Sequence, residues 1–548
     1  MEPIFTDKQL NNMSREDLIS LMKIVQEQTK KKDTEIQLLK DKQKELEFLN
    51  AMLSDRLTLA QRKQFGASSE KYAEGYEQMN LFNEAEASAD AETEELFEEI
   101  RPSSYKRKKR KGKKEEDLSN FETVETRTYK LEGEARYCPE CGKKYSVVTK
   151  ETVKRLRFIP AKFEVEEEIT YVYSCPKCGS MKRPEKEPSL IRGSIATPSL
   201  VAGIMNAKYV NGMPLARQER EFARYDLDLS TKTMANWIIN CADRYLKPLY
   251  QLMKEELLES RYIHCDESRI QVLGEPDQKG TTQNWMWVYL TDESSGSPQM
   301  VLFDYERTRA GYHPVNFLGN RFRGYLTCDG YQAYHSLGEG IIISGCLTHA
   351  RRRFDAALTA LKKDFTKEQL KETVAYQAMS RIGILYKIEE MLHDKTPEEK
   401  YEERQKQSRP VMDAMFEWLH TMEDSVDRSS LIGDAILYTL NQEVYLRRYL
   451  EDGHLSIDNN SAERALKNFA VGRRNWLFAK SVRGADASAL VYSITETALL
   501  NHLKPYAYLT YILDELRKMG AFPKEEELKK LLPWSENLPE YCRTKLKK

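Results

Sequence analysis

The spacing of hydrophobic residues changes several times along the chain, and the first pattern is a seven-residue repeat. Residues 14–62 contain neither glycine nor proline. Aliphatic residues recur there at one heptad position, namely Leu18, Val25, Leu39, Leu46 and Leu53. This heptad predicts a coiled coil over 14–65 that joins copies of the chain into a homo-oligomer. The alternative is an amphipathic helix that packs on its own domain.

Helical and strand patterns alternate in the rest of the chain. Hydrophobic positions at helical spacing predict helices over 186–258. Runs rich in β-branched and aromatic residues follow in 259–350, and a Ser/Gly/Pro turn separates two of them. Three strands in a row, followed by alternation of strand and helix, predict a mixed sheet with helices on it. Residues 351–450 carry no strand pattern, 451–485 form a distinct segment, and 486–548 are again helical.

Charge is unevenly distributed, although the formal net charge is only −1. Within 66–130, an acidic block at 83–100 precedes a basic block at 101–114. Such blocks are typical of a disordered, solvated linker. The basic block can nevertheless bind phosphates by releasing counterions, so the local pattern indicates a nucleic-acid partner where the net charge does not.

Composition argues against a membrane protein. Hydrophobic residues make up 40% of the chain and charged residues 31%. No apolar run reaches the roughly 18 residues that a membrane span needs. The first residues lack the basic-then-apolar pattern of a signal peptide. We therefore expect a cytoplasmic protein, associated with the nucleoid when it is bound to DNA.

Four cysteines form two CPxCG motifs. They are Cys138, Cys141, Cys175 and Cys178. Each CxxC turn directs two thiolates at one point, and two such turns complete a tetrahedral site with no open position. We predict a structural Zn²⁺ in a small β-rich module over 131–185. The other cysteines are scattered, which fits a reducing compartment better than a disulfide framework.

Residues 215–242 predict a helix, a turn near 225–229 and a second helix. Ser230 or Thr231 is suited to cap the second helix. In a recognition helix, the first exposed residues contact base edges. The residues at that place here are Thr231, Lys232, Thr233 and Asn236. The alternative is a helical hairpin with a purely structural role.

Two aspartates occur in similar contexts at the ends of hydrophobic runs. Asp266 in HCDES and Asp329 in TCDGY each follow a cysteine. Strand alternation puts the cysteines on one face of the sheet and the aspartates on the other. Two carboxylates from neighbouring strands would therefore converge. Glu267 should point the opposite way, which makes it a poorer candidate ligand.

A third acid, Glu463, lies in the segment at 457–478. Asn460 or Ser461 is suited to cap a helix there, and Glu463 lies at the edge of its apolar face. Arg464 lies well outside that face. Glu463 can therefore lean toward the sheet. Three converging carboxylates repel one another unless cations compensate them, and oxygen ligands suit Mg²⁺ or Mn²⁺.

These motifs together resemble a transposase of the insertion-sequence 66 family. The resemblance spans nearly the whole chain and includes the CPxCG pairs, KYVNGMPLARQE, HCDES, CDGYQAYH and CLTHARRRF in order. Its most specific segment is IDNNSAERALKNFAVGRRNWLFAKS at 457–481. Lys467 stands where arginine is common in the family, which keeps the charge.

The resemblance implies an RNase H-like catalytic domain of the DDE type, with Asp266, Asp329 and Glu463 as its triad. It also implies that 259–350 and 451–485 form two parts of this domain, separated by an all-helical insertion at 351–450. The expected fold class is therefore multidomain α+β. The implied partners are the terminal inverted repeats, target DNA and small accessory proteins of the same element.

Three functions remain open at this stage. The first is an active transposase that cleaves and joins DNA through two metal ions. The second is an RNase H-like nuclease without strand joining, and the third is a non-catalytic DNA-binding protein. Near the expected site, DNA contacts are predicted for Arg351, Arg352, Arg353, Arg473 and Arg474. Intramolecular ion pairs are the alternative for these arginines, and His349 ranks below the triad because a lone histidine is more often structural.

Overall fold

The computed structural model describes residues 163–174, 176, 178, 181–182, 184–277, 279, 282–362, 364–520 and 523–545, and the single residues 133, 140 and 143. The predicted coiled coil and linker lie outside the described residues, as do Cys138, Cys141 and Cys175. The chain forms two compact units. One includes His349–Met391 and Lys406–Val444, and the other includes the sheet, Leu392–Gln405 and the C-terminal part from Tyr445.

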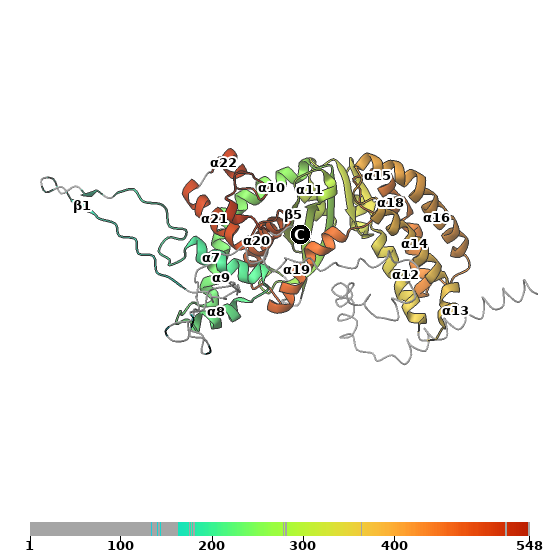
Figure 1. Cartoon of the computed structure of the whole chain (residues 1–548), viewed down its shortest axis with the longest axis horizontal. Helices are drawn as coiled ribbons and strands as arrows, with labels where there is room; N and C mark the ends of the chain where they lie inside the picture. The colour runs from blue at the N-terminus through green and yellow to red at the C-terminus, as the bar shows by residue number, and fades with distance from the viewer. Residues whose placement is uncertain are drawn as a thin grey trace, which may run out of the picture. The chain divides into compact units, whose positions relative to one another are not determined.

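A five-stranded mixed sheet organises the second unit (Figure 1). Its strands are β3 (Tyr262–Gln271), β4 (Gln283–Thr291), β5 (Met300–Glu306), β6 (Gly324–Cys328) and β7 (Ile341–Gly345). Their spatial order is β5-β4-β3-β6-β7. The first three pair antiparallel, whereas β6 runs parallel to both β3 and β7. The predicted mixed sheet is confirmed.

A short polar turn joins β4 to β5. Asp292 Oδ1 accepts a hydrogen bond from the backbone N–H of Ser294 at 3.0 Å. Gly296 adopts a φ of 68°, which residues with a side chain rarely adopt. The Thr291 hydroxyl donates to the carbonyl of Pro298 at 2.6 Å. The Ser/Gly/Pro sequence therefore forms the turn that the strand pattern predicts.

Aromatic side chains fill one face of the central strands. Tyr289 stacks on Phe317 of α11 (Tyr312–Leu318), with ring centroids 3.7 Å apart. Trp287 lies two residues earlier, on the same face, and meets Tyr334 of η6 (Gln332–Ser336) edge to face. All four side chains are buried. Each contributes about 1.5–3 kcal/mol of hydrophobic stabilisation.

Two helices cover the other face and the free edge of β5. They are α19 (Asn460–Trp476) and α20 (Val482–Leu500). Phe303 packs against both helices. The hydroxyls of Ser493 and Thr497 accept hydrogen bonds from the backbone N–H groups of Phe303 and Val301, at 2.8 and 2.9 Å. Because an open strand edge can pair with another chain, α20 protects the sheet.

The flanking helical regions share one hydrophobic core with the sheet. The helices that precede it are α7 (Pro198–Met205), η3 (Asn206–Val210), α8 (Leu215–Ala223), α9 (Thr231–Cys241), η4 (Ala242–Leu246) and α10 (Lys247–Glu259). Those at the C-terminus are α21 (Pro505–Met519), α22 (Glu525–Lys529) and η9 (Glu540–Cys542). Tyr209 meets Tyr492 edge to face at 5.0 Å and hydrogen-bonds Ser488 at 3.2 Å. α7 packs against α21.

The described part of 351–450 is helical and contains no strand, as predicted. Its elements are α12 (Leu347–Leu361), α13 (Lys367–Glu372), α14 (Val374–Met391), α15 (Pro397–Glu403), η7 (Arg404–Ser408), α16 (Arg409–Glu423), α17 (Leu431–Asn441), α18 (Glu443–Leu446) and η8 (Arg447–Leu450). Within the helical unit, α16 packs against α14 and α17. None of the described helices is both long and apolar enough to cross a bilayer.

The described residues of the cysteine module contain little strand, although strands were expected there. Among its described residues, only β1 (Tyr173–Ser174) and β2 (Met181–Lys182) form strands, paired antiparallel around Cys178. Residues 163–172 belong to no strand, and their side chains are exposed. The alternating pattern in this stretch therefore lacks a partner strand within the described residues, and an unpaired segment forms no sheet.

Candidate active site

The two aspartates lie at the same level on neighbouring strands. Parallel pairing of β3 and β6 aligns His264 with Thr327. Asp266 lies two residues beyond His264, and Asp329 lies two residues beyond Thr327. Side chains two residues apart in a strand share a face. Both carboxylates are half-buried.

The neighbouring cysteines point to the opposite face, as the alternation predicts. Cys265 and Cys328 are fully buried. The Cys265 thiol lies 3.4 Å from the hydroxyl of Tyr334, on the face that aromatic rings fill. The aspartates are therefore left on the face that α19 approaches.

Glu463 lies in the first turn of α19, which packs against β3 and β4. It is half-buried, whereas Arg464 is exposed, as the helical pattern predicts. The predicted cap is displaced by one residue: α19 begins at Asn460, and Asn459 occupies the cap position. The Asn459 side chain makes no capping hydrogen bond because it bonds across to β3 instead.

The surroundings of Asp266 favour its protonated form. Burial raises the pKa of Asp266 well above its usual range, and the charges of Glu267, Asp329 and Glu463 raise it further. Such a cluster holds a proton or a cation. Carboxylate oxygens are the ligands that Mg²⁺ and Mn²⁺ prefer, and Asp266, Asp329 and Glu463 remain the candidate ligands.

Glu267 is buried on the opposite face, in an ion pair with Arg309. The Arg309 Nε donates to Glu267 Oε1 at 2.6 Å, and the Tyr334 hydroxyl donates to the other carboxylate oxygen. Burial and the charge of Asp329 raise the pKa of Glu267 to about 7, although Arg309 opposes the shift. The Arg309 guanidinium also lies 3.9 Å from Asp329.

Sequence reasoning missed Arg309. Its guanidinium lies over the ring of Tyr331 at 3.7 Å and over that of Trp285 at 5.0 Å. The Tyr331 hydroxyl donates to the carbonyl of Arg309 at 2.9 Å. No local motif marks this residue, because its partners come from three other segments of the chain.

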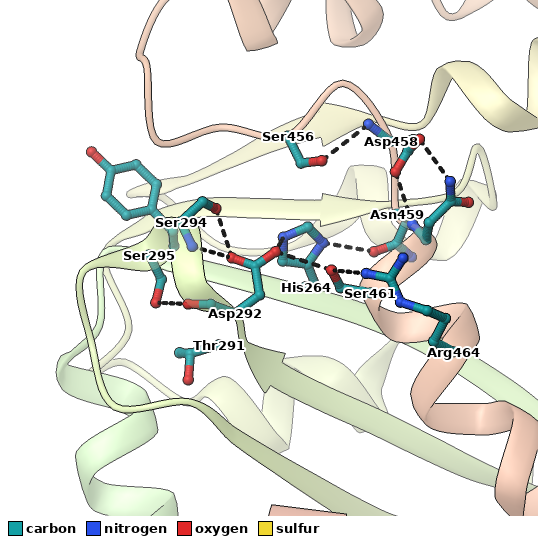
Figure 2. Close-up of polar contacts among 12 residues, drawn as sticks. His264, Thr291, Asp292, Ser294, Ser295, Ser456, Asp458, Asn459, Ser461 and Arg464 are labelled. Atoms are coloured by element: carbon teal, nitrogen blue, oxygen red, sulfur yellow. Dashed lines mark hydrogen bonds and ion pairs between the residues drawn. The ribbon is translucent and has the colours of Figure 1, made fainter. Parts of the chain in front are cut away.

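A chain of polar contacts fixes the start of α19 to the sheet (Figure 2). His264 Nδ1 lies 3.0 Å from Asn459 Oδ1, and its Nε2 lies 3.2 Å from Asp292 Oδ2. The Asn459 amide donates to the carbonyl of Cys265 at 2.8 Å. The Ser461 hydroxyl donates to Asp292 Oδ2 at 3.0 Å.

The contacts determine the protonation of His264. A carbonyl only accepts, so the Asn459 amide nitrogen must face Cys265, and its oxygen must face His264. Both imidazole nitrogens therefore face acceptors, which favours the imidazolium. Burial lowers the pKa of His264, but Asp292 and Asn459 outweigh it, so that the pKa is raised. The pKa of Asp292 is lowered because the attraction of His264 outweighs burial.

The second helix predicted within 215–242 forms. Ser230 caps α9, and its hydroxyl accepts from the backbone N–H of Thr233 at 3.2 Å. Lys232 and Asn236 are exposed one turn apart, while Trp237 is buried against the core. α9 therefore presents a polar face at its N-terminal half, as a DNA-reading helix requires.

The predicted DNA-binding arginines differ in their environments. Arg473 is half-buried and donates to the carbonyl of Arg269. Burial and the charges of Arg474 and Arg269 lower the pKa of Arg473, so positive charge is concentrated here. Arg474 is exposed.

The arginines at the start of α12 belong to the helical unit. Arg353 forms an ion pair with Asp434 at 2.5 Å and lies over the ring of Tyr438 at 4.1 Å. Arg351 is exposed and lies over the ring of Tyr386 at 5.6 Å. Arg352 and His349 are half-buried. For Arg353, the intramolecular ion pair that was the alternative to a DNA contact is therefore present.

Together, the fold and the cluster define a mixed α/β protein with a candidate divalent-metal centre. Profiles of four domains match the chain: transposase IS66 family at 193–487, zinc-finger binding domain of transposase IS66 at 135–179, IS66 C-terminal element at 493–534, and transposase C of IS166 homeodomain at 52–120. The chain belongs to the IS66 family of transposases. This membership supports a transposase role and confirms the resemblance seen in the sequence.

Similar proteins occur in Sinorhizobium fredii (strain NBRC 101917 / NGR234). The uncharacterized protein y4hP is 30% identical over 412 residues, which cover 72% of this chain and 73% of the relative. The uncharacterized protein y4jD is 29% identical over 418 residues, which cover 74% and 79%. Neither name states an activity.

Proposed function

We propose that this protein is a DDE-type transposase that cleaves DNA at the terminal inverted repeats of its element and joins the ends to target DNA. Asp266, Asp329 and Glu463 would hold Mg²⁺ or Mn²⁺. The observation that supports the proposal is the placement of these acids on neighbouring strands and on the first turn of α19, which packs against β3. Burial and the charges of Glu267, Asp329 and Glu463 raise the pKa of Asp266 there. A cation relieves that repulsion.

The order of the strands fits the RNase H-like domain that the sequence resemblance implies. Three antiparallel strands are followed by two parallel ones, and the two aspartates lie where β3 and β6 meet. The helical segment between Asp329 and Glu463 is then the expected insertion. When bound, two divalent ions would supply activation of the attacking oxygen and stabilisation of the leaving oxygen in phosphoryl transfer.

The chain's own residues would bind and orient the DNA. Arg309, held by Glu267 beside Asp329, offers positive charge where a phosphate approaches the cluster. Arg473 and Arg474 offer further charge at the end of α19. Lys232 and Asn236 would contact the inverted repeat from α9. A structural Zn²⁺ held by Cys138, Cys141, Cys175 and Cys178 would support a second DNA-contacting surface.

An assay with the element's own ends tests the proposal. DNA carrying one labelled terminal repeat is incubated with purified protein, a target plasmid and Mg²⁺ or Mn²⁺. We expect cleavage that leaves a 3′-hydroxyl, followed by covalent joining of that end to the plasmid. Cleavage without joining would favour the nuclease. Binding of the ends with neither reaction would favour a non-catalytic DNA-binding protein.

A further inference from the structure

One face of β3 meets the segment that leads into α19 at two successive positions. The Tyr262 hydroxyl donates to Asp452 at 2.6 Å, and its ring stacks on His454 at 4.8 Å. His264 bonds Asn459 at 3.0 Å. Asp266 is the next residue on the same face of β3, and α19, whose first turn carries Glu463, packs against this strand.

We propose that Tyr262, His264, Asp292 and Asn459 form a clamp that fixes the start of α19 before any metal ion binds. These positioning residues hold Glu463 opposite Asp266, so that the metal-binding carboxylates are already assembled. The inference rests on the proposed function of the triad. It adds four residues to the site, none of which is one of the carboxylate ligands.

The clamp opposes a repulsion that the site creates. Candidate metal ligands of like charge repel one another when no cation is bound, which would push the helix start away from the sheet. Asparagine is a preferred helix cap, yet the Asn459 side chain makes no capping bond in α19. Its amide instead uses both ends on β3, with His264 and the carbonyl of Cys265.

The clamp is rigid because it is buried and its polar groups are satisfied. Asn459 is fully buried and His264 is 3% exposed. Asp292 receives hydrogen bonds from the backbone and hydroxyl of Ser294 and from Ser461. A fully connected buried network of this kind specifies one arrangement. Figure 2 shows these contacts running from the β4–β5 turn through His264 to Asn459.

If the clamp holds the start of α19 in place before metal binds, the apparent dissociation constant for the metal ion should depend on the clamp. If a ligand binds only the docked arrangement, its apparent dissociation constant rises in inverse proportion to the fraction of docked molecules. Loosening the clamp should therefore weaken metal binding even in the absence of DNA. A bond that is only structural would lower thermal stability without changing metal affinity in the folded protein.

The test compares two clamp variants with a matched control. Asn459→Ala removes the bonds to β3, and Asp292→Asn removes the charge that faces His264. Thr497→Val is the control, because it removes a buried hydroxyl that joins α20 to β5, away from the clamp. Mn²⁺ binding to the full-length protein is measured by electron paramagnetic resonance without DNA, together with Tm.

We expect each clamp variant to bind Mn²⁺ about tenfold more weakly, which corresponds to about 1.4 kcal/mol. Thr497→Val should lower Tm but leave Mn²⁺ affinity unchanged. Unchanged affinity in either clamp variant that folds would overturn the clamp. Asp266→Ala distinguishes failure of the underlying proposal: if it binds Mn²⁺ as well as the wild type does, the triad itself is not the metal site.

Discussion

The guanidinium of Arg309 lies 3.9 Å from the carboxylate of Asp329 while it forms an ion pair with the buried Glu267. Arg309 therefore lies between Asp329, the second aspartate of the proposed triad, and Glu267 on the opposite face of β3. Glu267 is not positioned as a ligand, but it forms the ion pair that holds Arg309 beside Asp329.

Breaking this pair should destabilise the fold. Arg309→Gln leaves the Glu267 side chain buried without its ion-pair partner. We expect a loss of about 2 kcal/mol in the free energy of unfolding, below the usual cost for a fully buried pair because Arg309 is 35% exposed. Urea unfolding at pH 8 measures this loss. The double variant Arg309→Gln/Glu267→Gln should recover part of it, and additive losses would contradict the coupling.

Replacing Asp266 should separate stability from activity. Because burial and three neighbouring acids raise its pKa, Asp266→Asn should increase the Tm of metal-free protein. The same change should abolish strand cleavage while binding of the terminal repeat survives. Mn²⁺ should raise the Tm of the wild type but have little effect on the variant. Cleavage by Asp266→Asn, Asp329→Asn or Glu463→Gln at near wild-type rate would remove that residue from the triad.

Stability should depend on pH through an acidic residue of β5. Burial and the charge of Asp486 raise the pKa of Asp304 to about 6, despite the opposing charge of Lys254. A raised pKa means that the folded state holds the proton more tightly, so stability is lost as pH rises from about 4 to 6. Asp304→Asn should therefore gain up to about 2–3 kcal/mol over the wild type above pH 6 and much less at pH 4. Urea titrations at both pH values check this, and a pH-independent difference would refute it.

The cysteine motifs predict one Zn²⁺ per chain. Cys138→Ser/Cys141→Ser should lose the metal, because two thiolates cannot complete a tetrahedral site. Elemental analysis of purified protein measures the content. Cys241→Ser, at a buried cysteine outside the motifs, is the control and should retain zinc. Zinc retained by the double variant would place the ion elsewhere.

The basic residues should differ in their effects on DNA binding. Lys232→Ala and Arg474→Ala remove exposed charges, so each should weaken binding and reduce the slope of log affinity against log salt by about 1. Arg473 is half-buried and bonded to the Arg269 carbonyl, so Arg473→Ala should also lower Tm. If Arg473→Ala lowers Tm but leaves affinity and salt slope unchanged, its role is structural. Fluorescence anisotropy over a range of salt concentrations measures both quantities.

Much of the framework follows from local periodicity. Alternation in β3 determines that Asp266 and Cys265 face opposite ways, and the helical period separates Glu463 from Arg464. The predicted helices of 186–258 and 351–450 form because hydrophobic spacing and caps such as Ser230 act over a few residues. Residues 163–172 of the predicted β-rich module form no strand, because a strand also needs a partner and none of the described residues pairs with them.

The sequence by itself determined which residues carry the candidate chemistry, because family motifs and strand alternation are local in the chain. Only the tertiary structure decided which contacts hold these residues in place. Arg309 meets Glu267 across 42 positions, and His264 meets Asn459 across 195. No spacing rule reaches so far, because these contacts depend on how β3, the β4–β5 turn and α19 pack. The same packing makes the Asn459 side chain, at the cap position of α19, bond to the sheet and not to its own helix.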